Sequence, residues 1–290
     1  MRDSSGTNWG RAERCNPNEP FTVGCYEFWF DVSAIKGMRP GMEDRWNVAV
    51  HERGHAAVMA VYDGHGGPQV STYLMENLSA AVFADPQLEA DPPAVLKRAC
   101  ASCDDAIVKE HPGSKFGMLG NPGPGSTAIV VLMLPPRMFV ANVGDSRAIA
   151  ADREGAIVWQ SVDQRPDRPE ERSRIMRLGG LVRNVDGVHR AAGILAVSRA
   201  FGNAGIKHCI KAEPEVTELD LAAVDTFILC SDGLTDVVDA AKAVETVRCA
   251  PKGNSTLSSL SSGSVLSPTG KAMKAAKDRR SSGSVGEGRE

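Results

Sequence analysis

Short apolar runs, rich in Val and Ile, recur along the chain between residues 21 and 250, and such runs predict buried β-strands. The predicted strands cover residues 22–34, 45–51, 55–62, 126–134, 138–144, 146–152, 155–160, 193–198 and 226–231. Only short turns separate residues 126–134, 138–144 and 146–152, which leaves no room for crossover helices. We therefore expect antiparallel hairpins rather than parallel βαβ units.

Four segments have helical periodicity. Residues 68–83 begin with a proline at the first helical position, and residues 92–110 place their apolar and thiol side chains on one face. Two further helices fit residues 169–178, which run into a Gly-Gly pair, and residues 235–248. Hairpins combined with such helices predict an α+β fold, with antiparallel sheets inside and helices outside.

The two ends of the chain differ from this body. Residues 1–20 are polar and contain two prolines, so we expect a loose N-terminal arm. Residues 251–290 form a Ser/Gly-rich and basic tail, which we expect to be largely disordered because it has too little apolar surface to bury. Within it, residues 271–280 have the charge spacing of a short basic helix, for which a solvated helix or linker is favoured over a targeting signal. The folded domain is then expected at residues 21–250.

Composition excludes some classes of protein. With 290 residues, 42% of them hydrophobic, the chain can bury a sizeable core. Its formal net charge of −3 argues against nucleic acid as a partner, because binding to phosphate backbones needs a basic surface. No apolar run approaches the roughly 20 residues that span a bilayer. The first residues have no apolar signal core and no glycine for myristoylation. We therefore expect no membrane contact and a cytoplasmic or nuclear location.

The cysteines give no framework for disulfides. Their number, 7, is odd and their spacing is irregular. Cys100 and Cys103 form a single Cys-x-x-Cys pair inside a predicted helix, without a second pair to complete a zinc site. We favour buried, reduced thiols.

Two acid-glycine turns follow predicted strands. They are Asp-Gly-His-Gly-Gly at residues 63–67 and Ser-Asp-Gly at residues 231–233. A carboxylate fixed at a strand end, followed by a glycine that lets the backbone offer a carbonyl oxygen, suits a hard divalent cation. Either turn alone has an equally good explanation as ordinary turn chemistry.

Further candidate groups accompany these turns. The chain has additional carboxylates at Glu43, Asp44, Asp145 and Asp236 without matching histidines or thiolates, which favours Mg²⁺ or Mn²⁺ over zinc or copper. An arginine such as Arg39 can hold two phosphate oxygens, and a histidine such as His65 can protonate a departing alkoxide. Taken singly, each has a structural alternative: a surface ion pair for Arg39, a turn residue for His65, and a solvated strand start for the Glu43–Asp44 pair.

Taken in order, these motifs resemble those of the type 2C metal-dependent serine/threonine protein phosphatases. The matching motifs lie at residues 37–44, 61–67, 125–128, 141–147, 163–166, 195–202 and 230–236. The resemblance implies a four-layer α/β/β/α sandwich with a central antiparallel β-sandwich and a metal centre at one end.

The resemblance also implies the metal ligands, with two ions of Mg²⁺ or Mn²⁺ and a third, weaker one. Asp63 would bridge the two main ions, with the Gly64 carbonyl on one of them and Asp232 on the other. Glu43 and Asp44 would hold metal-bound waters. The weaker third site would be marked by Asp145 and Asp236.

The catalytic residues implied by the resemblance are Arg39, His65 and Asp63. Arg39 would bind the substrate phosphate and His65 would be the general acid. A metal-bridging hydroxide would attack the phosphorus directly, without a phosphoenzyme. The implied partners are phosphoserine and phosphothreonine proteins, and we expect a monomer. The Cys-x₅-Arg loop of thiolate phosphatases is absent from the sequence.

Three departures from the family pattern stand out. Gln164 replaces the histidine of Asp-His-Lys-Pro, and Asn203 replaces an aspartate; we expect both to be tolerated. More seriously, the family ends with a helix, Gly-Ser-x-Asp-Asn and a last strand. The nearest candidate, residues 283–287, has Gly286 at the ligand position. We therefore expect a C-terminally incomplete sandwich in which the last strand is missing and a neighbouring strand edge is exposed.

These departures leave three interpretations. The chain is a truncated or misassembled form of an active phosphatase, a weakened enzyme in which water or Glu287 completes the metal site, or a catalytically impaired pseudophosphatase that acts as a binding or regulatory protein. Because Asp63, His65 and Arg39 are all present, the sequence favours an enzyme.

Overall fold

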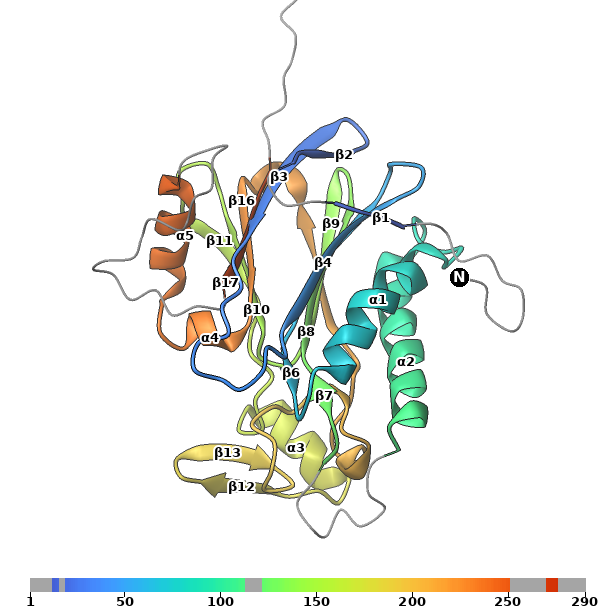
Figure 1. The fold of residues 1–290 in the computed structure, drawn as a ribbon, viewed down its shortest axis with the longest axis vertical. Coiled ribbons are helices and arrows are strands. Elements are labelled where there is room, and N and C mark those ends of the chain that lie inside the picture. The colour runs from blue at the N-terminus through green and yellow to red at the C-terminus, as the bar shows by residue number, and fades with distance from the viewer. Residues whose placement is uncertain (1–11, 16–18, 113–121, 251–269, 276–290) are drawn as a thin grey trace, which may run out of the picture.

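The structure is a computed structural model that describes residues 12–15, 19–112, 122–250 and 270–275. Two six-stranded antiparallel sheets face each other, with helices outside both, so the fold is an α/β/β/α sandwich (Figure 1). The expected α+β fold class is confirmed. No helix of the described residues is long and apolar enough to cross a membrane.

The first sheet is covered by two helices. Its strands, in spatial order, are β1 (Ala12–Arg14), β4 (Arg45–His51), β5 (Ala57–Tyr62), β8 (Ala128–Leu134), β9 (Arg137–Val143) and β15 (Glu215–Asp220). Helices α1 (Gln69–Phe83) and α2 (Pro92–Glu110) pack against its outer face. Asp91 caps α2 by accepting a hydrogen bond from the Ala94 N–H, and prolines occupy its first turn.

The second sheet completes the sandwich. Its strands, in spatial order, are β11 (Ile157–Gln160), β10 (Arg147–Ala151), β16 (Thr226–Cys230), β17 (Gly270–Ala275), β3 (Tyr26–Val32) and β2 (Phe21–Val23). Helices α4 (Asp232–Thr235) and α5 (Ala240–Cys249) lie on its outer side (Figure 1). Ala243 and Val244 of α5 form a buried cluster with Ile149 and Ile228 of this sheet.

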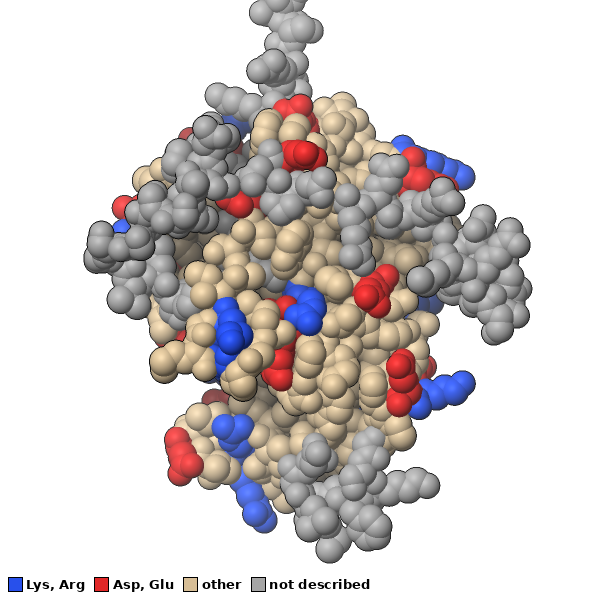
Figure 2. All heavy atoms as spheres, viewed as in Figure 1, with Lys and Arg blue, Asp and Glu red and all other residues tan. Residues whose placement is uncertain are grey.

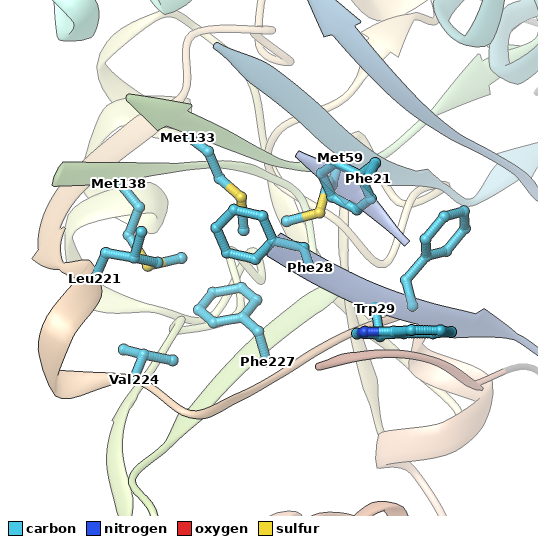
Figure 3. Close-up of a pocket in the computed structure, with 10 residues that line it drawn as sticks. Phe21, Phe28, Trp29, Met59, Met133, Met138, Leu221, Val224 and Phe227 are labelled. Atoms are coloured by element: carbon cyan, nitrogen blue, oxygen red, sulfur yellow. The ribbon is translucent and has the colours of Figure 1, made fainter. Parts of the chain in front are cut away.

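Successive side chains of β5 point alternately to the two faces of the first sheet, which shows why the layers form. Every residue of β5 is buried, because the strand has a core on each face. Val58, Ala60 and Tyr62 pack with the helices of the first sheet. Ala57, Met59 and Val61 point into the space between the sheets. Figure 3 shows one end of that space, where Phe and Met side chains from both sheets surround a small apolar pocket. No titratable side chain of the described residues lines this pocket.

Smaller elements lie below the other end of the sandwich (Figure 1). Helix α3 (Pro169–Arg177) and the hairpin of β12 (Val182–Val185) and β13 (Val188–Ala191) form one lobe. A three-stranded sheet joins β6 (Gly64–His65), β7 (Gly125–Ser126) and β14 (Phe201–Gly202). The 3₁₀ helices η2 (Ala204–Ile206) and η3 (Leu221–Ala223) complete the fold.

Several predicted boundaries are wrong. The predicted strand 22–34 turns at Gly24, which has a φ of +60°, and becomes the β2–β3 hairpin. The predicted helix 235–248 is divided, because α4 ends at Thr235 and α5 begins at Ala240. Residues 193–198 form a loop with a single bridge between Ala191 and Leu195, although their composition suits a strand.

The expectation of a missing last strand is also wrong. β17 lies between β16 and β3 and pairs with both, so the second sheet has no unpaired edge at that place. The short helix expected at residues 271–280 is also wrong for residues 271–275, which belong to this strand. Likewise, β1 lies within the predicted loose arm and pairs with β4. The rest of the arm up to residue 11, residues 16–18, and the tail at 251–269 and 276–290 lie outside the described residues, and so do Gly286 and Glu287.

The place of β17 can be tested with a proline. Ala272 lies opposite Ile228 on one side and Asp31 on the other. Proline has no N–H for the ladder and does not fit a central strand, so Ala272→Pro should lower the free energy of unfolding by more than about 2 kcal/mol. Lys36→Pro, in the exposed loop after β3, is the control. Equal denaturation midpoints for the two variants would contradict this pairing.

Candidate metal centre

Antiparallel pairing brings the sequence-predicted acids to one end of the sandwich. The start of β4 pairs with the end of β5, with Arg45 opposite Tyr62, so Asp44 lies beside Asp63. The start of β10 pairs with the end of β16, with Arg147 opposite Cys230, and the acids flanking this pair are Asp145 and Asp232. Four acids from distant parts of the sequence therefore meet because strand ends meet.

The backbone around Asp63 is held by its neighbours. The Asp63 carbonyl accepts hydrogen bonds from the Thr127 N–H at 2.9 Å and the Ser126 hydroxyl at 3.1 Å. The Asp63 N–H donates to the Thr127 hydroxyl at 3.3 Å, and that hydroxyl lies 2.6 Å from the Ser146 hydroxyl. These hydrogen bonds therefore hold the backbone from which the Asp63 carboxylate projects.

Gly64 lies where a side chain has no room. A Cβ at this position would come within 2.6 Å of the Glu43 carbonyl oxygen and 2.7 Å of the Ser71 hydroxyl. The Ser71 hydroxyl donates to the same Glu43 carbonyl, which ties the loop before β4 to helix α1. Glycine is required at position 64 because three backbone segments converge there.

The carboxylates repel one another in a buried site. Burial, followed by the charges of Asp44, Asp232 and Asp145, raises the pKa of Asp63 well above its usual value. Burial and then the charge of Asp236 raise the pKa of Asp232. Burial, followed by the charge of Asp232, raises the pKa of Asp145 to about 7. The cluster therefore has more negative charge than the protein neutralises.

The arrangement of these carboxylates is suited to a bound cation. No three Asp, Glu, His or Cys side chains in the described ranges form a ready-made ligand set. The side chains of Asp44 and Asp232 do lie within hydrogen-bonding range of Asp63, and Asp44 also accepts from the Ser231 hydroxyl at 3.0 Å. Buried carboxylates with raised pKa values, beside a glycine-bearing turn, suit a hard cation that completes its shell with water.

Two predicted site residues lie at the margin of this cluster. Arg39 is exposed on the loop before β4, and its side chain makes no hydrogen bond or ion pair within the described part of the chain. Asp236 is also largely exposed, and its carboxylate lies 3.5 Å from the Arg165 guanidinium. Arg165 lies 3.4 Å from Asp163 as well. Asp236 already has a positive partner.

His65 lies on β6, two residues after Asp63. Its Nε2 is 2.9 Å from the Oδ1 of Asn203. Burial lowers the pKa of His65, and the bond to Asn203 partly offsets this effect. Asn203, expected only as a tolerated departure from the family pattern, therefore contacts a candidate catalytic residue. Local sequence pattern does not predict this contact, because 138 residues separate the pair.

Other supporting residues were also missed. Gln164 accepts from the Gly144 N–H at 2.8 Å and donates to the Asn142 carbonyl at 3.1 Å, which fixes the turn that carries Asp145. Arg147 holds Asp163 through two hydrogen bonds of 3.0 and 2.7 Å. These residues lie in the motifs at 141–147 and 163–166, but the sequence does not show that the two motifs are hydrogen-bonded to each other.

Comparison with known proteins identifies the family of this chain. The sequence matches the family described as Protein phosphatase 2C over residues 29–280. The chain belongs to the protein phosphatase 2C family. This match confirms the resemblance drawn from the motifs.

Curated members of the protein phosphatase 2C family resemble the chain over most of its length. It is 35% identical over 223 residues to "Probable protein phosphatase 2C 56" of Oryza sativa subsp. japonica, covering 76% of this chain and 61% of that protein. It is 35% identical over 228 residues to "Probable protein phosphatase 2C 11" of Arabidopsis thaliana, covering 78% and 59%. The chain thus spans about three fifths of the length of these relatives.

Solved structures support the protein phosphatase 2C fold. The crystal structure of serine-threonine phosphatase 2C from Toxoplasma gondii has a TM-score of 0.72 and 22% identity, and the match covers 92% of this chain and 99% of that one. A Caenorhabditis elegans sex determining protein has a TM-score of 0.64 and 20% identity, covering 85% and 64%. At these identities the similarity concerns the fold alone.

The charge repulsion predicts a pH-dependent stability. The pKa of Asp145 rises from 3.8 to about 7 in the fold, so the folded state holds this proton more tightly. The resulting stabilisation is complete below pH 3.8 and is lost as the pH rises through about 7. Asp145→Asn should therefore stabilise the metal-free protein above about pH 7. The gain is at most about 4 kcal/mol, because a tenfold change in acidity corresponds to about 1.4 kcal/mol.

Urea unfolding of both proteins with a chelator, across this pH range, measures the difference. Asp105→Asn, at an exposed position of α2, is the matched control and should change little. A stability gain for Asp145→Asn that is as large at pH 4 as above pH 7 would contradict the proposed cause.

Proposed function

We propose that this chain is a metal-dependent serine/threonine protein phosphatase that releases phosphate from phosphoserine and phosphothreonine in proteins. Membership of the protein phosphatase 2C family supports a protein phosphatase. The observation that carries the metal dependence is the set of mutually repelling carboxylates Asp63, Asp145 and Asp232, whose pKa values are raised by burial and by their neighbours' charges. Such a group needs added positive charge to remain ionised near neutral pH.

In this proposal, Mg²⁺ or Mn²⁺ is held mainly by Asp63, the Gly64 carbonyl and Asp232. Glu43 and Asp44 bind through water, consistent with the Asp44 carboxylate being hydrogen-bonded to Ser231. Bound ions of this kind supply charge for the phosphate oxygens and make water more acidic. The third-site pair, Asp145 and Asp236, fits less well, because Arg165 lies 3.5 Å from Asp236 and its charge partly offsets the rise in the pKa of Asp145. A third ion would compete with this guanidinium.

The remaining groups serve the substrate. Arg39 is exposed and unpaired within the described residues, so its guanidinium can hold two phosphate oxygens without first breaking an ion pair. His65 protonates the serine or threonine oxygen as it leaves. A water molecule supplies the oxygen that bonds to phosphorus, and no side chain forms a covalent intermediate with the phosphoryl group.

The surface supports a protein substrate rather than a polyanion. Figure 2 shows acidic and basic side chains interspersed over the visible face. Several arginines of the α3 lobe are already paired: Arg174 binds Glu171 at 2.8 Å and Arg168 binds Glu215 at 3.0 Å. We propose that the chain acts as a monomer. Its cytoplasmic or nuclear location stays a prediction.

The function is tested by titrating the protein with Mn²⁺ or Mg²⁺ while measuring phosphate release from a phosphothreonine peptide. We expect metal-dependent turnover that Asp63→Asn lowers by more than about 100-fold, since it removes charge that positions the whole site. Asp105→Asn should keep full activity.

Absence of turnover above that of Asp63→Asn at millimolar metal would contradict the enzyme and favour the pseudophosphatase alternative. Binding of a protein partner that Asp63→Asn leaves unchanged would then support a regulatory role.

A further inference from the structure

We propose that Asn203 is a positioning residue that keeps the proton of neutral His65 on Nε2, so that Nδ1 is the nitrogen that gives a proton to the leaving oxygen. The proton-transfer part of this inference rests on the proposed phosphatase function. The control of His65 by Asn203 does not, because it follows from the arrangement of the two side chains.

The orientation of the Asn203 amide is determined by its second contact. Its Nδ2 donates a hydrogen bond to the Gly123 carbonyl at 3.0 Å. A carbonyl oxygen can only accept, so the amide nitrogen must face Gly123 and Oδ1 must face His65. Oδ1 is itself only an acceptor and lies 2.9 Å from His65 Nε2. The proton of the neutral imidazole is therefore on Nε2, and Nδ1 has the free lone pair.

The backbone of Asn203 holds this amide in place. Asn203 is fully buried and has a φ of +52°, a left-handed conformation that asparagine accepts more readily than most residues. Its N–H donates to the Pro124 carbonyl at 2.9 Å. The preceding Gly202 N–H donates to Asp104 at 2.9 Å, and Lys207 lies 2.6 Å from the same carboxylate. This buried ion pair anchors the segment that presents Asn203.

A glycine leaves room for the contact. Gly125 of β7 lies between the two outer strands of the small sheet, opposite His65 on one side and Gly202 on the other. A Cβ on Gly125 would lie 2.3 Å from Asn203 Oδ1 and 2.4 Å from His65 Nε2. The Asn203–His65 hydrogen bond thus lies directly over Gly125, and any side chain there would separate the two groups.

The proton balance of the step follows. When the ring is protonated, Nε2–H stays on Asn203 and Nδ1–H is the proton available for transfer. The water oxygen bonds to phosphorus and the water loses a proton to solvent, while the bond from phosphorus to the substrate oxygen breaks. The electron pair of that bond goes to the serine or threonine oxygen, which takes the Nδ1 proton. The ring is left neutral with its proton on Nε2, and Nδ1 regains a proton from solvent. Because Asn203 is neutral, it orients the ring without adding a charge to the acidic cluster.

The tautomer is measured directly by ¹⁵N NMR of histidine-labelled, metal-free protein at a pH where the ring is neutral. We expect the Nε2–H form for His65 in the wild type and in Asn203→Asp, which keeps an acceptor oxygen. Asn203→Gly removes the side chain but suits the left-handed backbone, and it should give a mixture of tautomers. Gly125→Ala should do the same by separating the pair. His51, whose Nδ1 accepts from the Arg53 N–H at 3.1 Å, is the internal control.

Kinetics separates positioning from mere folding. Asn203→Gly should lower kcat for a phosphothreonine peptide by about 10- to 100-fold, as loss of an orienting partner typically does. Hydrolysis of p-nitrophenyl phosphate should change by less than about 2-fold, because its acidic leaving group needs no proton.

An Nδ1–H tautomer in the wild type, an unchanged tautomer in Asn203→Gly, or equal losses on both substrates would overturn the proposal. Failure of the phosphatase function is recognised separately, because the wild type would then hydrolyse neither substrate. That result would overturn the proton-transfer step even if the spectra give the Nε2–H form.

Discussion

The site of this protein depends on the repulsion between carboxylates that the fold gathers at one end of its sandwich. Asp63 lies near Asp44 and Asp232, and Asp145 shares their field. Left without a counter-charge, Asp63, Asp145 and Asp232 retain protons at pH values where carboxyl groups are normally ionised, because burial and their neighbours' charges raise their pKa values. The hydrogen bonds around Asp63 and the close approach at Gly64 keep the acids together despite the repulsion. The packing of the rest of the fold offsets the repulsion between these carboxylates, and a bound cation would reduce that repulsion.

The sandwich can maintain this arrangement because its chemistry and its core lie apart. Every side chain of β5 is buried, between the sheets on one face and under α1 and α2 on the other. The acid, Asp63, comes directly after the strand. The opposite end of the inter-sheet space is lined by Phe and Met residues (Figure 3). Supporting polar contacts, such as Gln164 with the Gly144 turn and Asn203 with His65, lie at the end that carries the acids.

Much of this could be predicted from the sequence, for physical reasons. Strands such as β5, β8 and β9 are short apolar runs with tight turns, and the two acid-glycine turns directly follow β5 and β16. What local pattern cannot predict is pairing between distant residues. The contact of Asn203 with His65 and that of Arg165 with Asp236 arise from the tertiary arrangement. β17 was missed because the small and basic residues at 270–275 have no strand pattern, and its place is set by the gap between β16 and β3.

If the acidic cluster is a divalent-cation site, calorimetric titration of the metal-free protein with Mn²⁺ shows it most directly. Measured near pH 7 in buffers of different ionisation enthalpy, the titration reports protons released as well as heat. We predict saturable binding with net proton release, because the cation displaces protons from carboxyl groups such as Asp145, whose pKa is about 7. Asp63→Asn should weaken binding. Absence of binding at millimolar Mn²⁺, or binding without proton release, would contradict the account.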